Sequence, residues 1–436
     1  MTSTADRRST ILFTNHALAG RGGTELYVRD LAVALRGRGY RTMAYSPNLG
    51  EVAEELADLG VPVMGDLAAL PEPPDLIHGH HHLGFMTATL AFPHVPAVYV
   101  CHGTKPWEEY PPSSPSIRAY VAVSDATRTR VVDAVGVPPA EVITIPNFVD
   151  VRRFPPRTAL PASPRSVLIM SNRATADGFA GEAARVCRER GLRVTMHGSD
   201  SGSPVADPSA PLSEADVVVA AGRTALEAMA TGCAVILADT WGMGGLVTPE
   251  NFEALRRGNF GRQTSRGPCD HESVAAELDR YDPVGSRAVT RRVREEAGME
   301  AAVDRWEQVY ASIQQTAPVD PTSVARAAAD YLAGESAWVR RGHEWDRTVA
   351  TLEEHAAALT ERLDSALSDL AQYESRLAEA ESLNHSLQQR SLEQPGIRES
   401  GRGLARALRR RAAKAVADRA ALQPDGDHRS DPERSV

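Results

Sequence analysis

The sequence predicts an α/β protein with two doubly wound, Rossmann-like domains that face a cleft, followed by a helical, coiled-coil extension. Short apolar runs alternate with amphipathic helical segments through the first 155 residues. The alternation restarts after a segment rich in Pro and Arg, and beyond residue 318 heptad-spaced apolar residues replace the strand-like runs. Alternating strands and helices are typical of parallel sheets that carry helices on both faces.

Length and charge narrow the classes of function. The chain of 436 residues is too long for a single hydrophobic core, because one domain comprises roughly 150 residues. The net charge of −9 and a pI near 5.8 argue against a surface built to bind nucleic acid. The first residues, MTSTADRRST, lack the apolar core of a signal peptide, and no run approaches the roughly 18 apolar residues of a membrane span. We therefore expect a cytoplasmic protein.

The cysteines predict neither disulfides nor a zinc site. All four lie far apart in apolar or loop segments and form no CxxC pair: Cys101, Cys187, Cys233 and Cys269. Reduced, buried thiols fit this pattern better.

The first domain is expected over residues 1–155. Its opening run, STILFTNH, is apolar and short, as in a strand buried on both faces. A loop with three glycines, ALAGRGG, follows, and residues 24–38 then have the apolar spacing of a helix that ends before Gly39. Six further strands are expected at RTMAYS, VPVMGD, DLIHGH, AVYVCH, AYVAVS and EVITIP.

The second domain is expected over residues 156–317, after an interdomain linker at 155–164. Strands are expected at SVLIMS, LRVTMHG, ADVVVAA and AVILAD, and helices at FAGEAARVCRERG and TALEAMATG. In such sheets ligands bind beyond the carboxyl ends of the strands. We therefore expect the ligand in a cleft between the two domains.

Residues 318–394 have the pattern of a coiled coil. Apolar residues recur at alternating steps of three and four for about six heptads, with one polar residue, Asn384, at an a position. The positions are Trp345, Val349, Leu352, Ala356, Leu359, Leu363, Ala366, Leu370, Tyr373, Leu377, Ala380, Asn384 and Leu387. This seam favours homo-oligomerisation; the alternative is a lone amphipathic helix packed on the globular body.

The last region, residues 395–436, is expected to be a basic helix and a disordered tail. Residues 402–419 carry +6, from six Arg and one Lys against a single Asp. Leu404, Leu408, Ala412 and Val416 follow one another at steps of four. Such a helix can lie on an anionic membrane surface, as a peripheral contact at the inner face of the membrane. A solvated, charged tail is the alternative.

Two glycine turns between a strand and a helix are candidate sites for an anionic ligand. Gly22 and Gly23 precede the first helix, where backbone can approach a ligand closely. The turn lacks the three-glycine dinucleotide fingerprint, so NAD is not expected. The second turn begins Gly222-Arg223-Thr224, and Glu227 follows one helical turn later. Arg223 could grip a phosphate and Glu227 could accept hydrogen bonds from a ribose diol.

Two more candidates lie at the ends of expected strands. Arg173, after SVLIMS, suits a pyrophosphate contact, although an arginine that caps a surface loop is the alternative. His102, after AVYVC, could position a sugar hydroxyl as a neutral imidazole. The run DLIHGHHH holds four histidines, but no carboxylate or thiolate stands beside them at ligand spacing. We therefore expect no metal.

These residues together resemble the retaining glycosyltransferases of the GT-B fold, in particular the family 4-like, group 1 enzymes of bacterial glycan assembly. The first domain carries GGTELYVRDLAVALRGRGY, DLIHGHH, VCHG, AVSDATR and VITIPNFVDVRRF in the expected order, and the second carries TALEAMATGCAVILAD and then Gly244-Gly245. The similarity covers about residues 9–315 and not the tail.

The resemblance implies a hexosyltransferase that moves a sugar from a nucleotide-sugar donor to a glycan or lipid-linked acceptor in cell-envelope polysaccharide biosynthesis. Retention and independence of metal and of other cofactors are implied as well. Glu227 would bind the ribose and Arg173 the donor diphosphate, while Gly22 and Gly23 would lie against a phosphate. His102 would contact the transferred sugar, and the loop 103–116 would serve the acceptor.

The second domain departs from the family pattern at two places. A second glutamate is usual eight residues before the ribose-binding one, where this chain has Val219, and the usual Lys after Arg173 is missing. Arg223 could replace that Lys. Two other functions therefore stay open: a catalytically impaired scaffold subunit of a glycan-assembly complex, and a sugar-nucleotide epimerase on the same fold.

Overall fold

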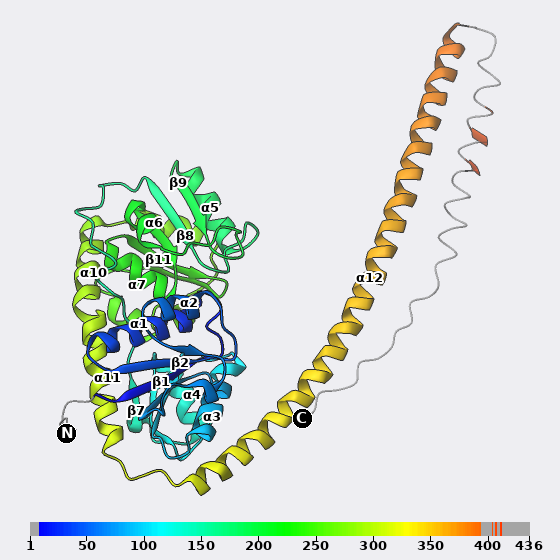
Figure 1. Ribbon diagram of the computed structural model, residues 1–436. Helices are drawn as coiled ribbons and strands as arrows, with labels where there is room; N and C mark the ends of the chain where they lie inside the picture. The colour runs from blue at the N-terminus through cyan, green and yellow to red at the C-terminus, as the bar shows by residue number, and fades with distance from the viewer. Residues whose placement is uncertain (1–7, 394–402, 404–405, 408–409, 412–436) are drawn as a thin grey trace. The chain divides into compact units, whose positions relative to one another are not determined.

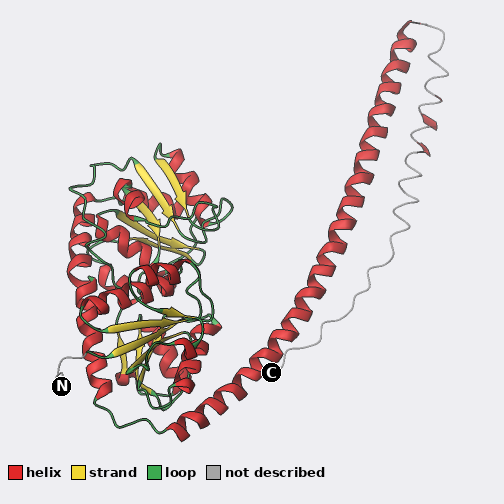
Figure 2. Ribbon diagram, viewed as in Figure 1, coloured by secondary structure: helices red, strands yellow, loops and turns green. Residues whose placement is uncertain are grey.

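The computed structural model describes residues 8–393, 403, 406–407 and 410–411. The chain divides into two compact units, Met1–Ser336 and Ala337–Val436. The first unit contains both expected α/β domains, and in each a sheet lies between helices (Figure 2). Within the described residues, no helix combines the length and the apolarity that crossing a bilayer requires.

The first domain is built on a seven-stranded parallel sheet with the order β3-β2-β1-β4-β5-β6-β7. All seven expected strands are present: β1 (Thr10–Thr14), β2 (Arg41–Tyr45), β3 (Val63–Met64), β4 (Leu76–His80), β5 (Ala97–Cys101), β6 (Ile117–Ala122) and β7 (Val142–Thr144). Its helices are α1 (Gly23–Gly37), α2 (Glu51–Asp58), α3 (His82–Ala91) and α4 (Asp125–Val135). Every residue of β1, β4 and β5 is buried, as expected for strands covered on both faces.

The second domain has a five-stranded sheet with the order β12-β11-β10-β8-β9. Four strands were expected and are parallel: β8 (Ser166–Met170), β9 (Arg193–His197), β10 (Val217–Ala220) and β11 (Ala234–Asp239). The fifth, β12 (Gly242–Leu246), was not expected and pairs antiparallel with β11. The helices are α5 (Phe179–Glu189), α6 (Ser209–Glu214), α7 (Gly222–Thr231), α8 (Phe252–Arg257), α9 (His271–Asp279) and α10 (Pro283–Glu296).

The chain returns to the first domain before residue 317. Helix α11 (Met299–Gln314) lies inside the range expected for the second domain, yet its Trp306 and Tyr310 pack in the core of the first sheet. Figure 1 shows α10 beside the second domain and α11 beside the first. Ala328, at the start of α12 (Pro321–Glu393), packs on the opposite face of that first sheet. The packing therefore places the end of the second domain near residue 298 rather than 317.

Helix α12 confirms that the heptad segment is helical, over 73 residues. The large apolar side chains described along the seam are between 45% and 62% exposed, from Val349 to Leu387. Nothing is described of the Trp345 side chain. Most of the expected basic helix at 402–419 lies outside the described residues.

All four cysteines are free thiols, and three of them are buried. Burial raises the pKa of Cys187 to about 11 and that of Cys233 to about 12. Burial of Cys101, Cys187 and Cys233 agrees with the expectation of buried thiols, and the raised pKa values disfavour the reactive thiolate.

Candidate active site

The two domains enclose a cleft at the carboxyl ends of both sheets. It consists of two adjoining pockets with volumes of about 730 Å³ and 450 Å³. Both pockets are lined by Gly23 from the first domain and by Arg173, Arg223 and Asp239 from the second. The cleft therefore lies where parallel α/β sheets bind their ligands.

The first-domain wall of the cleft centres on His102. Strand β5 ends at Cys101, and its parallel neighbour β4 ends at His80, so the two histidines meet at the same sheet edge. His80 Nδ1 and His102 Nε2 are 2.6 Å apart. Burial lowers the pKa of His102 to about 4, so its imidazole is neutral near pH 7. The expected placement of His102 in the cleft is found.

The neighbouring histidines belong to the protein core. His78 and His80 lie on one face of β4 because strand residues alternate in direction. Both are fully buried, and burial lowers the pKa of each well below its usual value. His78 Nδ1 lies 2.6 Å from the Tyr310 hydroxyl of α11. Among the described residues no group of three or more His, Cys, Asp or Glu side chains could hold a metal ion.

Glu109, which the sequence assigned only to the acceptor loop 103–116, is a buried partner of this wall. It lies in a short 3₁₀ turn, Trp107–Glu109, and its Oε2 accepts a 2.8 Å hydrogen bond from the His102 backbone N–H. Its Oε1 lies 3.5 Å from His81 Nε2. Burial favours a raised pKa, but the hydrogen bond from His81 and the neighbouring histidines lower the pKa of Glu109 to about 2. Glu109 is thus an ionised carboxylate that fixes the His102 backbone.

His81 links that carboxylate to the end of β1. The backbone N–H of His16 donates to His81 Nδ1 at 3.2 Å, which leaves Nε2 to carry the proton toward Glu109. His81 is the residue before α3 and has φ of 56°. A left-handed backbone is costly for a residue other than glycine and persists only where the surroundings impose it. Both His16 and His81 line the larger pocket.

The second-domain wall is formed by the turn into α7. Gly222 adopts φ of 57°, a conformation that glycine tolerates. Arg223 donates from Nε to Glu227 Oε1 at 2.9 Å and from Nη2 to Asp30 Oδ2 in α1. The side chains of Arg223, Asp30 and Glu227 are only 10%, 12% and 6% exposed. Glu227 is therefore buried and partnered.

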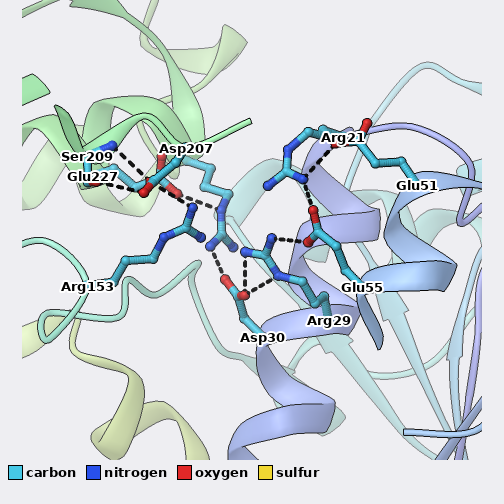
Figure 3. A network of polar contacts seen from close by, with 10 residues as sticks. Arg21, Arg29, Asp30, Glu51, Glu55, Arg153, Asp207, Ser209 and Glu227 are labelled. Carbon is cyan, nitrogen blue, oxygen red and sulfur yellow. Dashed lines mark hydrogen bonds and ion pairs between the residues drawn. The ribbon is translucent and has the colours of Figure 1, made fainter. Parts of the chain in front are cut away.

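Arg223 is already paired with two carboxylates, so a phosphate would have to share or displace one of them. Burial raises the pKa of Glu227 and Arg223 opposes that shift, whereas Arg223 and Arg29 overcome burial and lower the pKa of Asp30. Arg29 also donates to Glu55 at 2.8 Å. The network continues through Glu55 to Arg21 and Glu51, as Figure 3 shows.

The remaining expected residues differ in which of the two pockets they line. Arg173 lines both pockets, and its Nη2 donates to Asp239 Oδ2 at 3.0 Å. Gly222 lines only the larger pocket, and Thr224 and Glu227 only the smaller. Gly22 lines neither pocket; it is the residue immediately before α1. Of the two glycines, Gly23 lines both pockets.

Solved structures of other proteins share the fold of this chain. A glycosyltransferase from Rickettsia africae ESF-5 has a TM-score of 0.54 and 15% identity, over 71% of this chain and 100% of that structure. Anabaena HepE in complex with UDP and glucose has a TM-score of 0.52 and 15% identity, over 70% and 100% of the two chains.

The chain has the GT-B fold.

Residues 21–153 also match the model of Glycosyltransferase Family 4, so the recognised family segment falls in the first domain of this GT-B protein. No curated protein matches the chain.

The second GT-B domain explains the absent glutamate in structural terms. Val219 lies inside β10 and is buried in the core between that sheet and α5. The strand leads directly into the short turn at Gly222, so no loop is present to carry a carboxylate into the cleft. Asp239, at the end of β11, is a carboxylate of this wall that the sequence did not indicate.

Proposed function

We propose that this GT-B protein transfers a sugar, of the hexose type, from a nucleotide-sugar donor to a glycan or lipid-linked acceptor. The observation that carries the proposal is the pairing of two unlike walls across one cleft. One wall offers a neutral histidine and the other offers two arginines and a glutamate. Neutral hydrogen-bonding groups suit sugar hydroxyls, and guanidinium groups suit phosphate oxygens.

In this proposal the smaller pocket takes the nucleoside diphosphate. Arg173 and Arg223 would contact phosphate oxygens, and Glu227 would accept hydrogen bonds from the ribose. Each arginine would exchange part of its ion pair with a carboxylate for a contact with the ligand. Guanidinium groups and the N-terminus of α7 would stabilise the leaving diphosphate, so we propose transfer without a metal ion or other cofactor. Retention of configuration is proposed from the resemblance to retaining enzymes.

Calorimetry with UDP and with UDP-, GDP-, ADP- and dTDP-sugars tests the proposal. UDP and UDP-glucose come first because the similar HepE structure contains UDP and glucose. We expect saturable binding of one nucleotide series, weakened about ten-fold or more by Glu227→Ala, which corresponds to about 1.4 kcal/mol. Glu272→Ala, on the exposed surface of α9, is the matched control and should bind as the wild type does. Absence of binding in all four series would contradict the proposal.

A scaffold function is the second candidate. Val219 stands where the family usually has a glutamate, and both cleft arginines, Arg173 and Arg223, are already ion-paired. Deleting residues 337–436 separates the two candidates. An enzyme should keep nucleotide-sugar binding and hydrolysis in the remaining compact unit. A scaffold should lose its association with the glycan-assembly complex.

We also propose that α12 pairs with a second copy of the chain through its seam. The seam exposes Leu363 and Leu370 by 59% and 54%, and an a-position Asn such as Asn384 fixes register in self-paired helices. Light scattering should show an oligomer that Leu363→Glu with Leu370→Glu converts to a monomer; exposed Leu367→Glu, off the seam, is the control. A monomeric wild type would contradict this.

Sedimentation with anionic and with neutral vesicles tests the membrane contact proposed for residues 402–419.

A further inference from the structure

The hydrogen bond between His80 and His102 has a direction that the surroundings determine. His80 Nδ1 and His102 Nε2 are 2.6 Å apart, so one of these nitrogens carries the shared proton. Burial holds the pKa of both imidazoles far below neutrality. Each ring is therefore neutral and carries one proton, on either Nδ1 or Nε2.

The other nitrogen of His80 decides between the two arrangements. His80 Nε2 is buried and has no hydrogen-bond partner among the described residues. If His102 donated to His80, His80 would have to carry its proton on Nε2, as a buried N–H without a partner. A buried donor left unpaired costs about 1–3 kcal/mol, and orphaned donors are rarer than under-satisfied acceptors. Donation from His80 Nδ1 avoids this cost.

The position of the His102 ring is fixed from several sides. The ring of Tyr27 meets it edge to face at a centroid distance of 4.8 Å. The Tyr27 hydroxyl accepts a 3.1 Å hydrogen bond from Trp306 Nε1, and the His102 backbone is bonded to Glu109. His102 lines the larger pocket while its Nε2 faces His80. Nδ1 is thus the nitrogen that remains for a ligand, and no described residue forms a hydrogen bond with it.

We propose that His80 is a positioning residue that holds His102 as the Nδ1–H tautomer, so that His102 presents a hydrogen-bond donor to a sugar oxygen in the cleft. The identity of the ligand as a sugar rests on the proposed function, whereas the tautomer of His102 does not. In this state His102 has no lone pair facing the cleft. It therefore orients an oxygen acceptor of the donor sugar and does not remove a proton from the acceptor hydroxyl.

Long-range ¹H–¹⁵N spectra of the full chain labelled with [¹⁵N]histidine test the tautomer directly. The His102 signals are assigned by their loss in His102→Gln. We expect His102 to be protonated on Nδ1 in the wild type. Protonation on Nε2 would overturn the proposal, whether or not the protein binds a nucleotide sugar.

Variants of His80 test the positioning role. His80→Phe keeps an aromatic ring but removes the donor, and His80→Asn retains an N–H near the position of Nδ1. We expect mixed His102 tautomers in His80→Phe and the wild-type tautomer in His80→Asn. His78→Phe is the matched control, because His78 lies on the same strand face but bonds to Tyr310. An unchanged His102 spectrum in folded His80→Phe would contradict the proposal.

Hydrolysis of UDP-glucose adds a functional readout. We expect His80→Phe to lower kcat by roughly ten-fold or more, with KM for UDP-glucose changed less, and His80→Asn to restore most of the rate. Equal kcat values for wild type and folded His80→Phe would count against the positioning role. If the wild type neither binds UDP nor hydrolyses any nucleotide sugar, the proposed function fails, and the spectra still decide the tautomer. If His80→Phe does not fold, His80→Asn and the wild-type spectrum carry the test.

Discussion

The central polar groups of the two cleft walls, His102 and Arg223, are buried by opposite means. In the first domain, His80 and His102 lose their charge, because burial lowers the pKa of each imidazole. In the second domain, Arg223 keeps its charge and is matched by a carboxylate on each side, Asp30 and Glu227. Neutral imidazoles cost little to bury, whereas a buried guanidinium requires partners.

This difference suits the two parts of the proposed donor. The neutral imidazole of His102 can hold a sugar oxygen by a directed hydrogen bond. A charged wall can hold a diphosphate, because its arginines exchange carboxylate for phosphate oxygens. The two walls should therefore respond differently to mutation and to pH.

The largest effect is expected from Arg223→Met. The variant removes the cation between Asp30 and Glu227 and leaves two buried carboxylates facing each other. Removing one partner of a buried ion pair costs about 3–5 kcal/mol. Urea unfolding should show that loss, and the triple change Asp30→Asn, Arg223→Met, Glu227→Gln should recover much of it. A loss under about 1 kcal/mol in the single variant would show that the pair is solvated.

The second-largest effect is expected from acid, which should lower the stability of the first domain. The pKa of His102 in this wall, and that of His82, the buried first residue of α3 outside the cleft, are lowered from 6.5 to about 4. The unfolded chain therefore binds protons below pH 6.5 that the folded chain does not, and stability falls as pH is lowered toward 4. Each such histidine should cost about 2 kcal/mol between pH 7.5 and pH 5. Urea midpoints at the two pH values measure this, and His102→Asn should reduce the difference; an unchanged midpoint would argue against buried neutral histidines.

Gly79→Ala should have a smaller but clear effect on the first wall. Gly79 lies between the two core histidines of β4, and a Cβ there would stand 1.9 Å from Phe85 Cδ2. Overpacking of this kind costs about 1–3 kcal/mol, so thermal unfolding should occur at a lower temperature. Gly37→Ala, where a Cβ would meet nothing within 4 Å, is the control and should be neutral or slightly stabilising.

The smallest effect is expected where an ion pair joins the same two domains at the surface. Arg257 of α8 donates to Asp125 of α4 at 2.7 Å, with side chains 68% and 48% exposed. Exposed pairs contribute about 0–1 kcal/mol. The free energy of unfolding of Arg257→Gln should therefore lie within about 1 kcal/mol of the wild-type value. A loss as large as that of Arg223→Met would mean that charge between the domains matters more than burial.

Part of the cleft could be predicted because its residues follow strands directly. His102 and Arg173 follow apolar runs, and Glu227 lies one turn into a helix, so chain order alone assigned them to the carboxyl ends of the two sheets. Glu109 and Asp30 could not be found in this way. Glu109 enters the wall because the loop after β5 folds back, and Asp30 lies mid-helix in α1 as one charge among many.

The sequence by itself determined the two-domain α/β architecture, the seven strands of the first sheet and the four parallel strands of the second. Apolar runs and helical spacing are local patterns, and local patterns suffice to define elements. Only the tertiary structure decided that α11 packs on the first domain, that GMGGL forms β12, and that Arg223 is held by Asp30. An amphipathic stripe does not specify the surface that covers it, and a side chain's ion partner depends on segments that only folding brings together.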